Sequence, residues 1–398
     1  MNYDFDKALD RRGTRSNKWD KVGELFGNPD ALPMWVADTD FPCPHPVMEA
    51  LAERLEHPIF GYNYPPDSLH EAIADRMSKQ HGWEIDPNWI VPGTGVISAL
   101  YAALETVTMR GDEVIIQPPV YYPFFRALGD TGRQVLLNPL VPKDGRYRPN
   151  FEHLESLFVS RTKFPTREPR VAALILCNPH NPVGRAWSAE EIGRIGELCC
   201  EHGVTLISDE IHCDLMVGDR EHTVAASVSD ELAAKTITLM SVNKTYNLPG
   251  LKTSFTVIPD EEVRRRFQFA ARPAGSPNEL GLVALEAAIR DPDGYLGELL
   301  EYLRENLRVF REGISGIEGV ELIEPEGTYL TWVDMRGLGM NDDDLANFVV
   351  HEAGIAPDFG YAFGPGGQGF QRLNLGCTRA TVREAVDRLG TAVRRIRG

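Results

Sequence analysis

The chain reads VAALILC at residues 171–177, SAEEIGRIGELCCEHG at 188–203 and VTLIS at 204–208. The first and third segments have the length of strands and are apolar nearly throughout, as strands covered on both faces are. The middle segment opens with Ser188 and Glu191, which have the spacing of a reciprocal helix cap, and it closes with a glycine that can end a helix. The three segments therefore predict a strand, a crossover helix and a second, parallel strand.

Further apolar runs of strand length extend this unit into a sheet. They occur at residues 113–117, 134–137, 236–240 and 254–258. Because they alternate with amphipathic stretches of helix length, we expect a three-layer α/β fold with a mainly parallel sheet. This large domain is predicted to span residues 46–284.

The two ends of the chain differ from this pattern. Residues 1–45 are rich in turn formers and end near the rigid sequence FPCPHP, so we expect an N-terminal arm that is part of a small domain. Residues 285–398 are expected to form that smaller α+β domain, with helices at 295–314 and 381–396 and a strand near 329–333. One face of the last helix carries five apolar residues: Val382, Val386, Leu389, Val393 and Ile396.

The charge of the chain limits its partners. With 41 basic and 58 acidic residues among 398, the formal net charge is −17, and such a surface repels nucleic-acid backbones and anionic lipids. The N-terminus has no apolar signal-peptide core, and no apolar stretch is long enough for a membrane span. We therefore expect a soluble cytoplasmic protein that binds neither nucleic acid nor membranes. The cysteines and histidines lack ligand spacing, so we expect buried free thiols and no metal.

Chemically distinctive side chains follow several of the predicted strands. Tyr121, Asn181, Asp209 and Lys244 each come shortly after one of them. Because the carboxyl ends of parallel strands meet at one edge of a sheet, we expect these side chains to converge. The glycine-rich turn in VPGTGVISALYAAL (91–104) leads into a helix and adds free backbone N–H groups that can hold a phosphate.

These groups fit a phosphorylated aromatic aldehyde that condenses with an amine. A lysine forms the Schiff base and moves protons. A carboxylate keeps a ring nitrogen protonated, so that the ring accepts electrons. An aromatic side chain stacks on the face of the ring.

Longer motifs show a specific family resemblance. NPHNPVG (178–184), SDEIH (208–212), SVNKTYNLPGLK (241–252) and QRLNLGC (371–377) resemble, in order and spacing, the motifs of the fold type I, pyridoxal-phosphate-dependent aminotransferase superfamily. LPMWVADTDFPCP (32–44), SDEIHCDL and KTYNLPGL resemble its cystathionine β-lyase branch, the MalY/PatB-like C–S lyases. The resemblance implies the PLP-dependent transferase fold type I and pyridoxal 5′-phosphate as cofactor.

The resemblance also implies roles around the cofactor ring. Lys244 would bond to the cofactor and act as acid and base at the substrate Cα. Asp209 would pair with the pyridine nitrogen, Asn181 would hydrogen-bond the ring O3′, and Tyr121 would stack on the ring. Each role has a simpler alternative. Lys244 could be an ordinary surface lysine and Asp209 a helix cap. Asn181 could belong to an Asn-Pro turn, and Tyr121 could fill the core.

At the phosphate, the resemblance implies contacts from Ser241 and from the backbone amides of Gly95 and Val96. A simple helix-entry turn is the alternative for Gly95. Tyr62 resembles the tyrosine that reaches the phosphate of a neighbouring subunit, which implies a homodimer. Lys252 stands where many relatives have an arginine, so it supplies charge without two-point geometry.

On the substrate side, Arg372 resembles the arginine that binds the α-carboxylate with two parallel hydrogen bonds. A solvated strand-end arginine is the alternative. Ala37 and Trp35 would line the substrate, although packing explains Trp35 equally well. His212 stands where many relatives have a tyrosine that donates to O3′, and whether it contacts the cofactor stays open.

The reaction implied is β-elimination from cystathionine or a related cysteine S-conjugate, which yields a thiol, pyruvate and ammonia. An aminotransferase is the alternative, because transamination uses every residue named above. A cofactor-binding regulator without turnover is a third hypothesis. A serine acyl-transfer enzyme is disfavoured because the chain has SVNK (241–244) without the accompanying SDN and KTG motifs. A dinucleotide-binding oxidoreductase is disfavoured because Gly93–Thr94–Gly95 lacks the third glycine of the GxGxxG motif.

Overall fold

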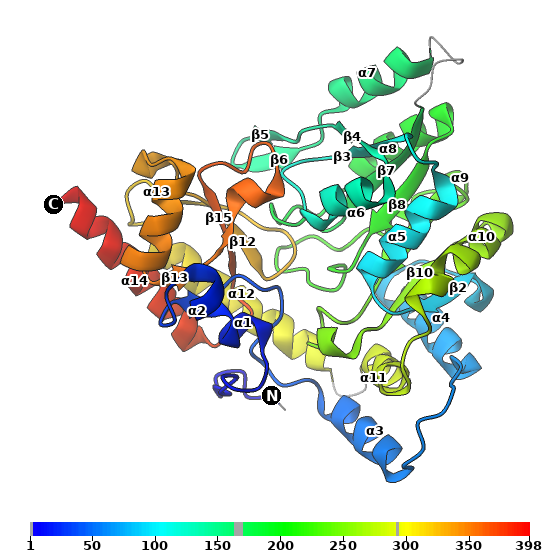
Figure 1. Cartoon of the computed structure of the whole chain (residues 1–398), viewed down its shortest axis with the longest axis horizontal. Helices are drawn as coiled ribbons and strands as arrows, with labels where there is room; N and C mark the ends of the chain where they lie inside the picture. Colours follow the sequence, from blue (N-terminus) through cyan, green and yellow to red (C-terminus); the bar gives the residue numbers. More distant parts are fainter. Residues whose placement is uncertain (1–2, 163–169, 292–293) are drawn as a thin grey trace.

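The computed structural model describes residues 3–162, 170–291 and 294–398, and a seven-stranded sheet forms its centre (Figure 1). The strand order is β2 (Ile90–Gly93), β10 (Ser254–Val257), β9 (Thr236–Met240), β8 (Thr205–Asp209), β7 (Val171–Cys177), β3 (Glu113–Ile116) and β4 (Gln134–Leu137). β10 runs antiparallel to both of its neighbours, and the other pairs are parallel. The predicted mainly parallel sheet is confirmed; β2, which contains a proline, was not predicted.

Helices cover both faces of this sheet. They include α5 (Val96–Val107), α6 (Pro123–Thr131), α7 (Phe151–Thr162) and α8 (Ala189–His202). Ile175 of β7 packs in one core with α5 and α6, whereas Leu174 packs in another with α7 and α8. Successive strand residues point to opposite faces, so the predicted three layers are confirmed. Ser188 and Glu191 cap α8 reciprocally, and Gly203 ends it in the left-handed conformation.

A smaller antiparallel sheet lies in the C-terminal part. Its order is β11 (Glu321–Ile323), β12 (Leu330–Asp334), β15 (Phe370–Asn374) and β14 (Asp358–Phe359), and α12 (Tyr295–Ile314) and α14 (Arg379–Arg397) pack together beside it. In α14, Val382, Leu389 and Val393 are buried and Val386 packs against the core. Ile396 departs from the expected buried face with 45% exposure, because the last turn projects beyond the core (Figure 1).

The N-terminal segment joins this C-terminal part through β1 (Leu32–Pro33), which pairs in parallel with β13 (Ile355–Ala356). The domain boundaries themselves stay a prediction. The other helices and strands are α1 (Asn17–Asp20), α2 (Val22–Phe26), α3 (His45–Glu56), α4 (Asp67–His81), α9 (Asp230–Ala233), α10 (Glu261–Ala271), α11 (Glu279–Arg290), α13 (Asp342–Asn347), β5 (Val141–Lys143) and β6 (Arg146–Arg148).

The cysteines are free thiols, as expected, but two of them differ in burial. Cys43 and Cys200 are half-buried, and the other four are buried. Within the described ranges, none of the helices combines the length and the apolarity that crossing a bilayer requires.

Candidate active site

The carboxyl ends of β7, β8 and β9 lie beside a cavity of about 330 Å³. Eleven of the predicted site residues line it: Trp35, Ala37, Gly95, Val96, Tyr121, Asn181, Asp209, His212, Lys244, Lys252 and Arg372. They come from the N-terminal segment, the central sheet and the C-terminal sheet. The structure thus brings together residues that are up to 337 positions apart in sequence, such as Trp35 and Arg372.

Lys244 follows β9, and its ammonium has an unusual environment. Its Nζ donates a hydrogen bond to the Ala37 carbonyl at 2.6 Å. Burial, reinforced by the positive charge of Arg372, lowers the pKa of Lys244 to about 8. A lysine in this state exchanges protons readily near neutral pH.

Asp209 is the last residue of β8 and is only 3% exposed. Its Oδ1 accepts a hydrogen bond from the Ile211 amide at 3.2 Å. Burial raises the pKa of Asp209 to about 7, which the Ile211 hydrogen bond and the nearby Lys244 only partly offset. A ligand nitrogen that carries a proton would stabilise the ionised carboxylate.

Arg372 lies in β15, is buried and contacts residues from three segments. Its Nη1 donates to Asn181 Oδ1 at 3.0 Å, and its Nη2 donates to the Trp35 carbonyl at 2.6 Å. Nη2 is also 2.6 Å from Asp358 Oδ2 in β14, an ion pair that sequence reasoning missed. Asn181 Oδ1 already accepts a hydrogen bond from Arg372. The Nδ2 amide of Asn181 is therefore the group that it offers to a ligand, as a donor.

The N-terminus of α5 forms another wall of the cavity. Gly95 is its N-cap, with a φ of +152° that favours glycine, and the helix has no side-chain cap. The Gly95 amide donates to Ser254 Oγ at 3.0 Å, so the next amides, from Val96 onward, are the ones available to an anion. Lys252 also lines the cavity.

His212 and Tyr121 both line the cavity, and they differ in how deeply they are buried. Burial, followed by the charges of Lys244 and Arg372, holds the pKa of His212 well below its usual value, so the imidazole is neutral. Tyr121 is half-buried and also packs against the α5–α6 core. The two alternatives for Tyr121, ring contact and core filling, are therefore compatible.

Two predicted residues do not line this cavity. Ser241 is buried; its hydroxyl donates to the Thr253 carbonyl at 2.8 Å and accepts from the Asn243 amide at 3.1 Å. Tyr62 lies in the segment between α3 and α4, and its side chain is fully exposed. Their roles stay predictions.

Other cavity residues were not identified from the sequence. These are Asn17, Val36, Thr94, Ile97, Ser98, Tyr122, Cys177, Ile211, Asn243 and Pro249. Most of them are next to a predicted residue in the chain, and this adjacency is the sequence feature that could have identified them. Asn17 comes from α1, far from any motif, and no local pattern indicates it.

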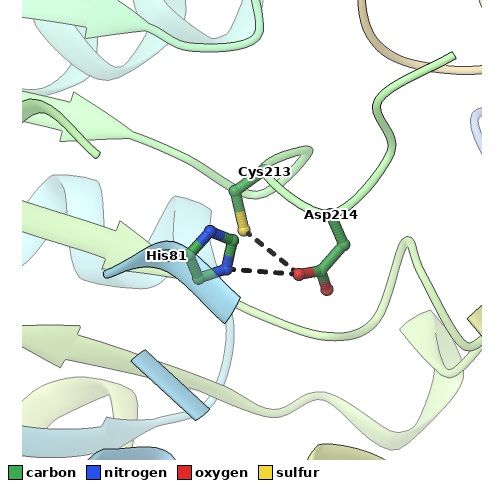
Figure 2. A group of neighbouring side chains, drawn as sticks. All are labelled: His81, Cys213 and Asp214. Carbon is green, nitrogen blue, oxygen red and sulfur yellow. Dashed lines mark hydrogen bonds and ion pairs between the residues drawn. The ribbon is translucent and has the colours of Figure 1, made fainter. Parts of the chain in front are cut away.

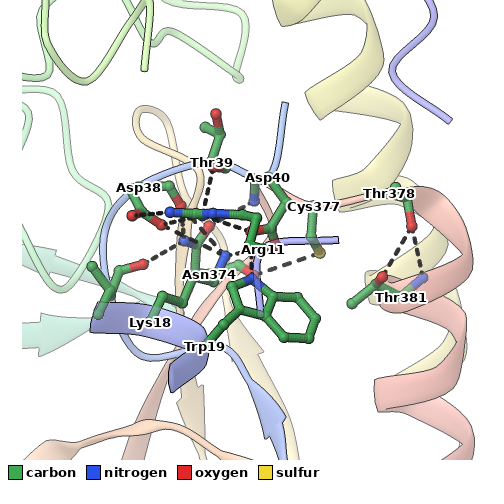
Figure 3. Close-up of polar contacts among 12 residues, drawn as sticks. Arg11, Lys18, Trp19, Asp38, Thr39, Asp40, Asn374, Cys377, Thr378 and Thr381 are labelled. Carbon is green, nitrogen blue, oxygen red and sulfur yellow. Dashed lines mark hydrogen bonds and ion pairs between the residues drawn. The ribbon is translucent and has the colours of Figure 1, made fainter. Parts of the chain in front are cut away.

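A charge cluster in the N-terminal segment, largely shielded from solvent, includes two residues that flank Ala37 closely in sequence, Asp38 and Asp40 (Figure 3). Lys18 Nζ is 2.8 Å from Asp40, and Arg11 is 2.8 Å from both Asp38 and Asp40. Asn374 of β15 donates to the carbonyls on either side of Ala37, those of Val36 and Asp38. These contacts fix the backbone that accepts the hydrogen bond from Lys244.

A second cluster consists of His81, Cys213 and Asp214 (Figure 2), and Cys213 follows the cavity residue His212 in the chain. Their potential metal-ligating atoms are within 4.8 Å of one another. However, Asp214 is 2.9 Å from Arg76 Nη2 and accepts a hydrogen bond from Thr245 at 2.8 Å. Burial alone would raise the pKa of Asp214, but Arg76 and His81 hold it well below the usual range. Arg76 already supplies the cation, so we interpret the cluster as support for the segment after Lys244.

Comparison with known proteins agrees with this geometry. The family model for aminotransferase class I and II matches residues 34–389. The chain is 43% identical to cystathionine beta-lyase PatB of Bacillus subtilis, over 98% of this chain and 99% of that protein. It is 32% identical to protein MalY of Escherichia coli, over 99% and 100% of the two chains.

A solved structure is also similar to this chain over its whole length. Cystalysin from Treponema denticola, which contains a pyridoxal 5′-phosphate cofactor, superposes with a TM-score of 0.93 and 34% identity over 100% of both chains. The resemblance inferred from the motifs is confirmed, and this chain belongs to the aminotransferase class I and II family.

Proposed function

We propose that this protein is a pyridoxal-phosphate-dependent C–S β-lyase that cleaves cystathionine or a related cysteine S-conjugate to a thiol, pyruvate and ammonia. The main support is that Lys244, Asp209 and Arg372 line one cavity, with the pKa values of Lys244 and Asp209 moved toward neutrality. The choice of lyase over transaminase follows the 43% identity to PatB over nearly the full length.

The cavity residues fit the cofactor. The buried Asp209 carboxylate suits a protonated pyridine nitrogen, and the uncapped start of α5 suits a phosphate. Tyr121 offers an aromatic face, and Asn181 an amide donor. When bound, pyridoxal 5′-phosphate supplies a ring that accepts the electrons left at Cα of the amino acid.

Each residue then has a defined part in the reaction. Arg372 binds the substrate carboxylate and so fixes the orientation of Cα. Lys244, with a pKa of about 8, takes the Cα proton. Asp209 keeps the proton on the ring nitrogen. When sulfur is attached to Cβ, the electron pair freed at Cα forms a Cα=Cβ double bond as the C–S bond breaks. The sulfur leaves as a thiolate and takes up a proton, and water converts the remaining three-carbon unit to pyruvate and ammonia.

The active unit is proposed to be a homodimer. Tyr62 is fully exposed, beside Ile59, Phe60 and Tyr64 with 64%, 57% and 81% exposure. An apolar patch of this kind suits burial against a second copy, where Tyr62 would reach the partner's phosphate site. Sedimentation of the holoenzyme and of Tyr62→Ala tests this, with weaker cofactor retention expected in the variant. A monomer with full activity would contradict it.

Product analysis tests the proposed reaction. The cofactor-loaded protein is incubated with L-cystathionine, with and without an added 2-oxo acid. Pyruvate, ammonia and homocysteine in equal amounts without the oxo acid are expected. If turnover requires the oxo acid and yields a new amino acid, the protein is an aminotransferase instead.

A further inference from the structure

Arg372 is already in contact with a carboxylate of the protein itself. Asp358 lies directly opposite Arg372 in the β14–β15 pair, and its Oδ2 is 2.6 Å from Nη2. The side chains are 15% and 3% exposed, so solvent screens this ion pair little. The same Nη2 donates to the Trp35 carbonyl, whereas Nη1 donates to Asn181.

The geometry of a guanidinium makes Nη2 the critical nitrogen. A carboxylate binds a guanidinium at two points through one of two edges, Nη1 with Nη2 or Nε with Nη2. Both edges include Nη2, which Asp358 and Trp35 already contact. Nε has no hydrogen-bond partner among the described residues. A carboxylate that binds at two points must therefore share Nη2 with Asp358 or take it from Asp358.

The charge balance leads to the same conclusion. The lysines and arginines that line the cavity are Lys244, Lys252 and Arg372. The family resemblance places Lys244 at the cofactor aldehyde and Lys252 at its phosphate, which leaves Arg372 for the substrate carboxylate. Asp358 matches that single positive charge before the substrate arrives.

We propose that Asp358 sets the affinity of Arg372 for the substrate carboxylate, because it occupies Nη2 in the resting site and opposes a second negative charge there. Asp358 is a positioning residue in this scheme and does not contact the reacting atoms. The inference rests on the proposed role of Arg372 in carboxylate binding.

The test uses Asp358→Asn in the holoenzyme, which removes the charge and keeps an oxygen that can accept from Nη2. The probes are L-cystathionine as substrate and propionate, a carboxylate without an amino group, as inhibitor. Because a nearby repulsive charge is lost, KM and the propionate inhibition constant should both fall about tenfold, with kcat changed less than about twofold. Inhibition by ethylamine, which has no carboxylate, should not change. An unchanged or larger propionate constant overturns the inference.

Three further variants make the result decisive. Asp334→Asn is the matched control, because Asp334 lies in β12 of the same sheet and forms a 2.6 Å ion pair with Arg336, which, unlike Arg372, does not line the cavity. It should leave both constants unchanged. If Asp358→Asn does not fold, Asp358→Ser removes the same charge and should give the same tenfold fall.

Arg372→Lys distinguishes a failure of the proposed role of Arg372 from a failure of the inference about Asp358. If this variant binds propionate as the unmodified protein does, the role of Arg372 in the proposed function fails. If it binds propionate more weakly while Asp358→Asn binds no more tightly, only the inference about Asp358 fails.

Discussion

Two buried groups of charges lie close together in this protein and are built in opposite ways. In the N-terminal arm, Lys18 and Asp40 meet at 2.8 Å as an ion pair. In the cavity, the Lys244 ammonium donates to a backbone carbonyl and the Asp209 carboxylate accepts from a backbone amide. The pKa values of this second pair are moved to about 8 and about 7. Paired charges hold the arm in place, whereas the cavity charges are kept for a ligand.

The largest expected effect comes from Lys244→Ala. Because one positioned acid–base group contributes about 10²- to 10⁴-fold, kcat for pyruvate formation should fall at least about 10³-fold. The folded protein should still bind cofactor noncovalently, and its free energy of unfolding should change by less than about 1 kcal/mol. The exposed Lys235→Ala is the matched control and should keep full activity. Full activity in Lys244→Ala would rule out the mechanism.

Lys18→Met should lower the free energy of unfolding, the quantity that Lys244→Ala leaves nearly unchanged. The Lys18 side chain has 0% exposure, and its loss leaves the buried Asp40 carboxylate without one of its cations. Breaking a buried pair in this way costs about 3 kcal/mol of unfolding free energy, measured by urea denaturation. Lys21→Met removes an exposed lysine that pairs with Glu24 and should cost less than about 1 kcal/mol. Equal stability of the two variants would mean that the arm cluster does not hold the fold.

Asp209→Asn tests whether the cavity charges oppose folding. Burial raises the pKa of Asp209 from 3.8 to about 7, so the folded state holds a proton that the unfolded state has lost between those values. Stability from this group is therefore lost as pH rises from about 4 to 7. Without cofactor, the variant should be more stable than the unmodified protein at pH 8 by about 4 kcal/mol, and nearly equal to it near pH 4. A less stable variant at pH 8 would contradict this.

The two regions also differ in how far the sequence predicts them. Asp209 ends one apolar strand and Lys244 follows the next, and the rule that parallel strands end at one edge places both in the cavity. The cap of α8 is equally local, because Ser188 and Glu191 are three residues apart. Local patterns of this kind specify six of the seven strands of the central sheet and the site residues at their ends.

Contacts between distant segments were not predictable in this way. Lys18 meets Asp40 across 22 residues through an arm without strong periodicity. Asp358 meets Arg372 because β14 pairs with β15, and a two-residue strand gives no periodic signal. The exposure of Ile396 reflects where the core ends, which the helix period does not encode.

The smallest expected effect concerns His212, which lines the cavity but is buried without a charge. Burial, with Lys244 and Arg372 nearby, holds its pKa well below 6.5, so it should stay neutral between about pH 6 and 8. His212→Asn keeps a side-chain donor, so kcat/KM should fall less than about tenfold, and the pH profile in that range should keep its shape. The exposed His57→Asn serves as control. If the acid limb of the profile moves in His212→Asn alone, His212 titrates with Lys244 and Asp209 and belongs with the cavity charges.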